Sequence, residues 1–269
     1  MITMHRMRGC GTLLAALARL AAFSIFVFAM RNPAAQAQAG GSLTVSAAAS
    51  LKDAIGDVET AYKRSHANTE FANNFGSSGT LAAQIDQGAP VDVFLSAAAK
   101  PMDDLEAKGL VVAGTRHNLL RNSLVLIASL SSGLHGFADL TGSGVRVIAL
   151  GDPASVPAGQ YGQQTLAFLH LLDPVKAKLV LGKDVRQVLA YVETGNADAG
   201  LVYATDALIS NKVRVVATAP SQSHDPIVYP MAVVKGSRNE AAARSFVEFL
   251  AGPEAKSIFQ RHGFSIAEK

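Results

Sequence analysis

The sequence has little cysteine, no tryptophan and few charged residues. Its 269 residues include one Cys and no Trp, and only 17% of them are charged. One thiol supports neither a disulfide framework nor a cysteine-ligated metal centre. Apolar residues make up 49% of the chain and the net charge is +3, a balance that excludes intrinsic disorder. The length predicts one large or two modest domains with a substantial core.

The first 39 residues have the features of a secretory signal peptide. Two arginines precede the almost wholly apolar run 13–30, and residues 37–39 match the A-x-A cleavage pattern. Arg19 interrupts the apolar run, which argues against the alternative of a permanent membrane anchor. Cys10 lies before the run rather than after it, which argues against a lipoprotein signal. We therefore expect residues 1–39 to be removed and the protein to be periplasmic.

Removal of this leader changes the charge balance. The leader contains four arginines and no acidic residue, so the mature chain of 230 residues has 20 basic and 21 acidic residues and a net charge of −1. The basic surplus thus belongs to the leader and does not indicate a nucleic-acid partner. The mature chain also lacks cysteine, so it needs no disulfide in an oxidising compartment.

Strand-like and helix-like segments alternate along the mature chain. The predicted strands are 43–47, 70–75, 91–96, 123–128, 145–150, 179–181, 200–203, 213–216 and 227–234. Helical spacing of apolar residues follows most of them, which predicts an α/β fold with mostly parallel sheets. Ser50 and Asp53 predict a capping box at one helix start, and Pro101 is expected to open another helix. Segments 119–123 and 224–230 are candidate hinges.

The common catalytic motifs are missing. The sequence has no G-x-S-x-G, no P-loop, no dinucleotide-binding glycine motif and no H-E-x-x-H. Its histidines are far apart, and the neighbouring Asp103 and Asp104 would point in different directions on a helix. These absences favour a binding protein over an enzyme.

Small polar turns follow several strands and precede predicted helices. Ser50, Ser77, Ser78 and the turn 156–159 occupy such positions, and Val185 lies at another helix start. Ligands of open α/β sheets bind beyond the carboxyl ends of the strands. Helix N-termini offer free N–H groups and a positive dipole end there. Each serine alone could be an N-cap, but several such positions together favour an anion site.

An ordered series of short blocks resembles the periplasmic molybdate-binding proteins of ABC transporters. The resemblance runs from about residue 42 to 266. The blocks are AAASL (47–51), FGSSGTL (75–81), GAPVDVF (88–94), GDP (151–153), VPAG (156–159), DVR (184–186), GLVY (200–203), YP (229–230) and GF (263–264).

The resemblance implies the two-lobed periplasmic binding protein fold. Each lobe would be a mixed, mostly parallel sheet flanked by helices, and two strands would form the hinge. Lobe 1 would contain residues 40–120 and 226–269, and lobe 2 residues 121–225. The implied function is to capture molybdate, and tungstate, in the cleft and deliver it to a membrane permease. The resemblance implies a monomer with no cofactor, no enzymatic activity and no nucleic-acid partner.

The resemblance also implies the ligand-binding residues. Ser50 and Ser78 would bind the oxyanion from lobe 1 through hydroxyl and backbone N–H groups. Ala158 and Val185 would offer backbone N–H groups from lobe 2, and Tyr203 its phenolic hydroxyl. The metal would be bound as the whole oxyanion, without direct protein ligands. Gly79 departs from some relatives that have a third serine there, a change that could loosen the turn or remove a secondary contact but leaves the Ser78 match intact.

A site of this kind would offer only hydrogen-bond donors. A tetrahedral dianion has only acceptors, and hydroxyl and N–H groups match it without a countercharge. Phosphate usually carries a proton near neutral pH, so a site without an acceptor would disfavour it. Sulfate carries no proton and would not be excluded in this way. The alternative function is therefore a binding protein for another tetrahedral oxyanion, such as sulfate or phosphate.

Two other classes of protein fit the sequence less well. A hydrolase using Ser50 or Ser78 lacks an assignable His–Asp pair. The effector lobes of a transcription regulator would lack the signal peptide.

Overall fold

Two β-sheets account for the strands of the described chain, which comprises residues 42–267 of the computed structural model. These residues belong to one unit of the chain, Gly40–Lys269. The predicted signal peptide, 1–39, lies outside the described residues. Within the described residues, none of the helices has the length and apolar character needed to cross a membrane.

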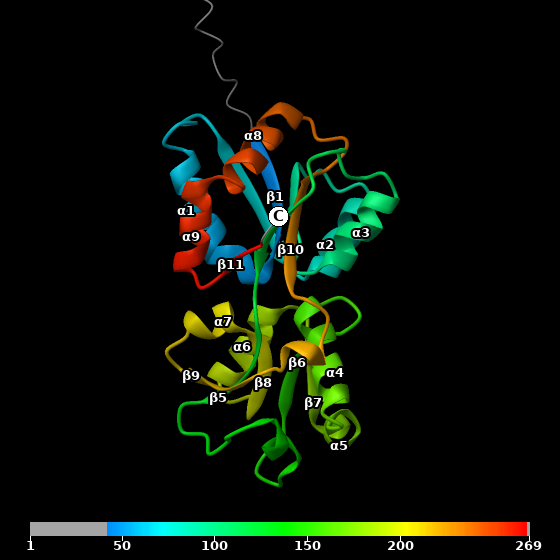
Figure 1. Ribbon diagram of the computed structural model, residues 1–269, viewed down its shortest axis with the longest axis vertical. Helices are drawn as coiled ribbons and strands as arrows, with labels where there is room; N and C mark the ends of the chain where they lie inside the picture. The colour runs from blue at the N-terminus through cyan, green and yellow to red at the C-terminus, as the bar shows by residue number, and fades with distance from the viewer. Residues whose placement is uncertain (1–41, 268–269) are drawn as a thin grey trace, which may run out of the picture. The chain divides into compact units, whose positions relative to one another are not determined.

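The first sheet has six strands in the order β11-β4-β10-β3-β1-β2. Its strands are β1 (Ser42–Ala48), β2 (Glu70–Gly76), β3 (Val93–Leu95), β4 (His117–Arg121), β10 (Val228–Val233) and β11 (Ser265–Ile266). The helices of this sheet are α1 (Lys52–Tyr62), α2 (Ser78–Asp86), α3 (Ala99–Ala107), α8 (Glu240–Leu250) and α9 (Pro253–Arg261). Helices α1, α8 and α9 pack together on one side of the sheet and α2 and α3 on the other (Figure 1). We call this part lobe 1.

The second sheet has five strands in the order β7-β6-β8-β5-β9. Its strands are β5 (Leu124–Ser129), β6 (Ile148–Gly151), β7 (Leu179–Gly182), β8 (Ala199–Tyr203) and β9 (Val213–Thr218). The helices are α4 (Pro157–Phe168), α5 (Leu172–Val175), α6 (Val185–Glu193) and α7 (Ala204–Leu208). Its short 3₁₀ turns are η2 (Phe137–Thr141) and η3 (Lys176–Lys178), whereas η1 (Ala49–Leu51) lies between β1 and α1 in lobe 1 and η4 (Ser221–Ser223) lies between β9 and β10. We call this part lobe 2.

The helices of lobe 2 pack on both faces of its sheet because side chains alternate along the buried strand β8. A Cβ at Gly200 would contact Val188 and Val192 of α6, whereas Leu201, one residue later, is a near neighbour of Gly162 in α4. Successive residues of a strand point to opposite faces, so α6 and α4 cover opposite sides.

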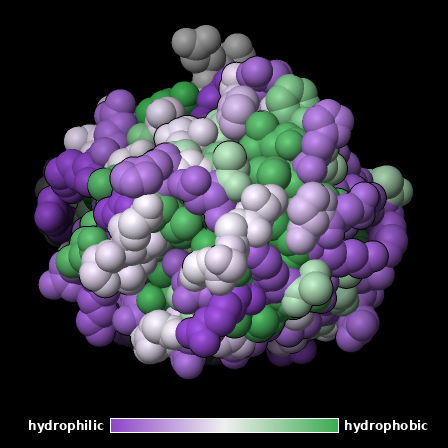
Figure 2. All heavy atoms as spheres, turned by 90° about the horizontal axis from the view of Figure 1, so that it is seen from below, coloured by the Kyte–Doolittle hydropathy of each residue, from purple (hydrophilic) through white to green (hydrophobic). Residues whose placement is uncertain are grey.

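Hydrophilic residues cover most of the face in Figure 2, with apolar residues between them in several places.

The chain crosses between the lobes twice. The first crossing joins β4 to β5 between Arg121 and Leu124, and the second joins β9 to β10 between Thr218 and Val228. Figure 1 shows both crossings between the lobes. This arrangement confirms the predicted fold class, a two-lobed α/β fold with helices flanking each sheet. The residue boundaries predicted for the domains, 40–120, 121–225 and 226–269, stay predictions.

The expected parallel majority within the sheets is wrong. Strands β1, β2 and β3 are parallel to one another, as are β6, β7 and β8. All the pairings made by β4, β5, β9, β10 and β11 within the described sheets are antiparallel. Four of these strands adjoin the two crossings: the chain leaves its sheet from β4 and β9 and enters the other sheet at β5 and β10.

Two predicted helix starts also need correction. Helix α3 begins at Ala99, so Pro101 is its third residue, a place in the first turn where a missing N–H costs little. Ser50 does not form the predicted capping box: it lies inside η1, and neither η1 nor α1 has a side-chain cap. The short strands β4 and β11 were not predicted.

Candidate functional site

All five residues predicted to bind the ligand line one small cavity between the lobes. Each of the five is buried. The complete lining is Ala48, Ala49, Ser50, Gly76, Ser77, Ser78, Ala97, Val156, Pro157, Ala158, Val185 and Tyr203. Segments far apart in the sequence thus meet at this cavity. Its lining, as far as the described residues form it, is uncharged.

Lobe 1 contributes two turns that follow the parallel strands β1 and β2. Ser77 ends the extended segment and caps α2, since its Oγ accepts from the Thr80 N–H at 3.3 Å. Ser78 is then the first residue of α2, and its Oγ accepts from the Ala97 N–H at 2.8 Å. Ser50 lies in the turn after β1, where its Oγ is 3.1 Å from the Tyr229 Oη.

Lobe 2 contributes the N-termini of α4 and α6. A Cβ at Gly159 would lie 1.9 Å from the Gly151 carbonyl oxygen, so only glycine lets α4 begin this close to the end of β6. Ala158 is the second residue of α4. Asp184 caps α6 by accepting from the Gln187 N–H at 2.9 Å, which makes Val185 the first helical residue. The backbone N–H groups at such positions have no partner inside the helix.

These elements concentrate hydrogen-bond donors around one cavity. The N-termini of α2, α4 and α6 all reach it, and the first helical residues after β1 lie beside them. Helix N-termini combine free N–H groups with the positive end of the helix dipole. The arrangement can therefore hold a small ligand rich in acceptors without a charged side chain.

Tyr203 reaches the cavity from the end of β8. Its hydroxyl donates to the Ala97 carbonyl oxygen across the lobes at 3.3 Å. Burial raises the pKa of Tyr203 well above its ordinary value, and burial likewise raises the pKa of Tyr229. Both phenols therefore keep their protons at neutral pH and remain donors.

Arg186 follows Val185 and connects the two lobes. Its Nε lies 2.6 Å from Asp206 Oδ1 as an ion pair within lobe 2, although the two groups lack the alignment of a hydrogen bond. One terminal nitrogen donates to Asp53 Oδ2 at 2.7 Å and contacts the Ser50 carbonyl oxygen at 3.4 Å, both in lobe 1. Asp206 is fully buried. Burial raises its pKa to about 6, although Arg186 opposes that shift.

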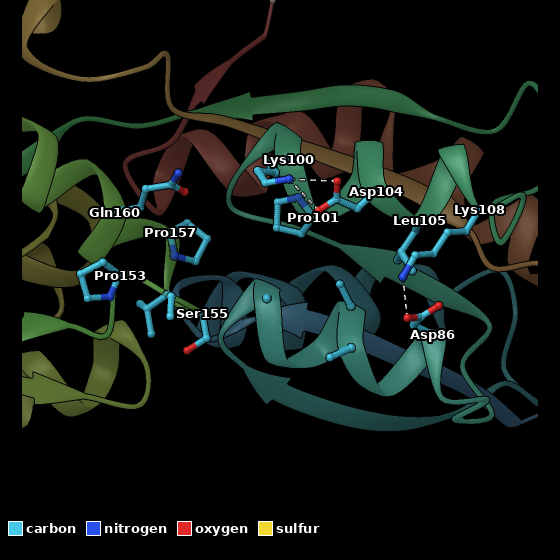
Figure 3. A pocket seen from close by; sticks show the side chains of 15 residues that line it. Asp86, Lys100, Pro101, Asp104, Leu105, Lys108, Pro153, Ser155, Pro157 and Gln160 are labelled. Carbon is cyan, nitrogen blue, oxygen red and sulfur yellow. Dashed lines mark hydrogen bonds and ion pairs between the residues drawn. The ribbon is translucent and has the colours of Figure 1, made fainter.

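A further contact joins the lobes at an open groove beside the cavity. The Gly79 N–H donates to the Ser155 carbonyl oxygen at 3.0 Å. Figure 3 shows this groove, with Lys100 and Lys108 paired to carboxylates on one wall and Ser155 on the other. The groove and the cavity share Val156 in their walls. Within residues 42–267, no cluster of three or more acidic, His or Cys side chains is placed to hold a metal ion.

Sequence reasoning assigned no role to several residues around the cavity. Tyr229 and Arg186 lie in blocks that carry the resemblance, but nothing local indicates that one contacts Ser50 or that the other joins the lobes. Asn122 lies in a candidate hinge, and its Nδ2 donates to the Tyr229 Oη at 3.2 Å. Ala97 has a featureless side chain, yet its backbone contacts both Ser78 and Tyr203.

A two-lobed α/β fold with a cavity between its lobes defines a class of solute-binding proteins. Residues 43–265 match the family model of bacterial extracellular solute-binding proteins. The chain therefore belongs to the family of bacterial extracellular solute-binding proteins. These are transport proteins, not enzymes.

Individual relatives support this assignment. The chain is 45% identical to a putative ABC transporter substrate-binding lipoprotein of Bacillus subtilis, over 83% of this chain and 86% of the relative. It is 43% identical to a molybdate-binding protein of Haemophilus influenzae, over 84% and 91% of the two chains. A solved substrate-binding domain of a putative molybdenum ABC transporter from Clostridium difficile is 44% identical, with a TM-score of 0.67, over 84% of this chain and 99% of that one.

Proposed function

We propose that this protein captures molybdate, and also tungstate, in the cavity between its lobes and delivers it to the membrane permease of an ABC transporter. It works in the periplasm as a monomer, without a resident cofactor. The observation that carries the proposal is the convergence of hydrogen-bond donors on one uncharged cavity. The names of the relatives from Haemophilus influenzae and Clostridium difficile support molybdate as the cargo.

The donor set fits a tetrahedral dianion. Ser50 and Ser78 supply hydroxyl groups, and Tyr203 supplies a third when its 3.3 Å bond to the Ala97 carbonyl oxygen is exchanged for one to the anion. The backbones of Ala158 and Val185 supply N–H groups at helix starts. A dianion loses much hydration energy when it enters a buried cavity, and several donors aimed at it in advance offset that loss. Dipoles without a countercharge favour binding that can be reversed when the cargo is passed on.

Closure of the lobes follows from the division of these donors. Lobe 1 supplies the serines, and lobe 2 supplies Ala158, Val185 and Tyr203. The anion is fully hydrogen-bonded only when both lobes surround it, so binding shifts the population toward the closed form. A permease that recognises the closed form would then select the loaded protein.

Calorimetric titration of the purified protein with molybdate, tungstate, sulfate and phosphate tests the proposal. We expect molybdate and tungstate to bind at least about tenfold more tightly than sulfate or phosphate, a difference of about 1.4 kcal/mol. Sulfate binding that is tighter than molybdate binding would overturn the assignment of the cargo.

Substitution of the site residues tests the binding mode separately. Ser78→Ala and Tyr203→Phe each remove one hydroxyl, and we expect each to weaken molybdate binding by about tenfold or more, because hydrogen bonds to ions are strong. The matched control is Tyr62→Phe, which removes a buried hydroxyl 3.1 Å from Ser245 within lobe 1. Unchanged affinity in both site variants would reject the residue assignments even if molybdate binds.

A further inference from the structure

The Ser50 hydroxyl is held by a chain of hydrogen bonds that begins in the first crossing between the lobes. Asn122 lies in that crossing, and its Nδ2 donates to the Thr205 Oγ1 at 2.9 Å and to the Tyr229 Oη at 3.2 Å. The Tyr229 Oη in turn lies 3.1 Å from the Ser50 Oγ. The chain therefore ends at a residue that lines the ligand cavity.

The orientation of the Asn122 amide is fixed by its other partner. The Ser123 backbone N–H donates to the Asn122 Oδ1 at 2.9 Å. A backbone N–H can only donate, so the oxygen of the amide must face Ser123 and the NH₂ group must face Tyr229. Both hydrogens of that NH₂ group are then used, one on Thr205 and one on Tyr229.

This orientation favours one direction for the next hydrogen bond, in which either oxygen could be the donor. Because the Tyr229 Oη already accepts from Asn122, its own hydrogen is free to donate to the Ser50 Oγ. We assign Tyr229 as that donor, which leaves the Ser50 hydrogen for the cavity that Ser50 lines. Burial raises the pKa of Tyr229, so this donor keeps its proton.

The hydroxyl hydrogen of Ser78 is also available to the cavity, because of a different hydrogen-bond partner. Its Oγ accepts from the Ala97 backbone N–H at 2.8 Å, and a backbone N–H cannot act as an acceptor. The hydrogen of Ser78 is therefore also left for the cavity. Two serines on separate turns of lobe 1 thus each have a hydrogen available for the ligand.

We propose that Asn122 and Tyr229 are positioning residues that fix Ser50 as a donor, so that the cavity selects an anion without a proton. This inference rests on the function proposed above. An unconstrained serine hydroxyl could turn and accept from a protonated anion such as hydrogen phosphate. With Tyr229 bonded to one lone pair of the Ser50 Oγ, the hydroxyl could accept from the anion only through its second lone pair. Its hydrogen would then point away from the anion, where the described residues offer the Ser50 Oγ no hydrogen-bond partner besides Tyr229.

We call the hydrogen-bonded chain from Asn122 through Tyr229 to Ser50 the relay. A double-mutant cycle tests it with molybdate and phosphate as probes. The cycle compares the wild type, Ser50→Ala, Tyr229→Phe and the double variant by calorimetry, with Tyr62→Phe as the matched control. We expect Tyr229→Phe to lose about tenfold in molybdate affinity while phosphate affinity is kept or rises. In the Ser50→Ala background, Tyr229→Phe should have little further effect, because the partner through which it acts is gone.

Asn122→Asp tests the direction of the relay without changing its size. A carboxylate at position 122 accepts from Tyr229, so Ser50 must donate to Tyr229 and turns an oxygen lone pair toward the anion. We expect a larger loss of molybdate affinity than in Tyr229→Phe, about a hundredfold. In the Tyr229→Phe background, Asn122→Asp can act on the anion only through the negative charge of the new carboxylate. We therefore expect it to reduce molybdate affinity less in that background than in the wild type.

The outcomes separate the relay from the proposed function. If the wild type prefers phosphate to molybdate, both are overturned. If the wild type binds molybdate but Tyr229→Phe matches Tyr62→Phe, only the relay is overturned. Equal losses for molybdate and phosphate in Tyr229→Phe would indicate a purely structural role and would also reject the relay. Thermal unfolding of each variant identifies any loss that comes from misfolding.

Discussion

At the scale of single residues, the cavity depends on groups that are buried and neutral beside one buried ion pair. Asp206 is fully buried next to Arg186, which also contacts Asp53 in the other lobe. Burial raises the pKa of Asp206 to about 6 from an ordinary value of 3.8. Desolvation therefore outweighs the attraction of the neighbouring guanidinium. The buried carboxylate lowers the stability of the folded protein when it is ionised, so its effect on stability depends on pH.

The raised pKa predicts a pH dependence of stability that Asp206→Asn should remove. Below pH 3.8 the carboxyl is protonated in both the folded and the unfolded chain. As pH rises toward 6 the unfolded chain ionises first, so the folded state loses stability relative to the unfolded state. We expect the free energy of unfolding of the wild type, relative to the variant, to fall by up to about 3 kcal/mol over this window.

Urea unfolding of the ligand-free protein between pH 4 and 7 measures this difference. The comparison uses the wild type and Asp206→Asn at each pH. Curves that stay parallel across the range would show that Asp206 ionises equally in both states and would contradict the prediction.

At the scale of elements, the turns that follow strands were predictable, whereas their long-range partners were not. Period-2 and helical patterns located β1, α2, α4 and α6, and small polar residues marked their junctions. The Ser50 cap was wrong because its hydroxyl bonds instead to Tyr229, which is 179 residues away in sequence. Strand β4 is short and partly exposed, and β11 has two residues, so neither has a local pattern.

The glycine at position 79, where some relatives have serine, also could not be explained without the three-dimensional contacts. The sequence could show only that glycine replaces a serine found in relatives. In the structure, a Cβ at Gly79 would lie 2.6 Å from the Ser155 carbonyl oxygen of the other lobe. Glycine therefore permits the close approach of α2 to the turn before α4.

Gly79→Ala should hinder closure of the lobes. The added methyl group meets the Ser155 backbone, which cannot give way as a flexible side chain would. We expect molybdate affinity to fall by about tenfold or more, because closure completes the donor set. Small-angle scattering with saturating molybdate should give a larger radius of gyration than the wild type.

The matched control for this substitution is Gly56→Ala on α1. A Cβ at Gly56 would meet no atom within 4 Å, so affinity should be unchanged and stability should rise by about 0.5–1 kcal/mol. Equal radii of gyration for Gly79→Ala and wild type would show that the Ser155 contact does not limit closure.

At the scale of the whole molecule, the two lobes are held together by few polar contacts outside the crossings. Arg186 joins α6 of lobe 2 to Asp53 and Ser50 of lobe 1, Gly79 joins α2 to Ser155, and the Tyr203 hydroxyl joins β8 to the Ala97 carbonyl oxygen. These contacts lie at or beside residues that line the cavity. Ligand binding and closure therefore use neighbouring positions on the same helix N-termini.

Arg186→Lys should weaken the closed form without removing a charge. Lysine cannot contact Asp206 and Asp53 together through a rigid planar group. Because the Asp53 side chain is 46% exposed, solvent screens that pair, so we expect molybdate affinity to fall only about fivefold, near 1 kcal/mol. The measurement is calorimetry combined with scattering in the absence and presence of molybdate.

Arg116→Lys is the matched control. Arg116 also pairs with two carboxylates, Asp103 and Glu106, but all three lie in lobe 1. Its substitution should therefore leave molybdate affinity unchanged. If the two lysine variants behave alike, the bridge between the lobes does not contribute to binding.

The interrupted order of the six-stranded sheet has a consequence for how the protein acquires its fold. Strand β10 lies between β3 and β4, yet it begins at Val228, long after β3 ends at Leu95. All five strands of the other sheet lie between these two points. The chain is synthesised from its N-terminus at about 5–20 residues per second. The edge of β3 therefore waits roughly 7–26 s for its neighbour β10 to be made. The later lobe can therefore be complete while the earlier one still presents an open strand edge, which is when the chain is most exposed to aggregation.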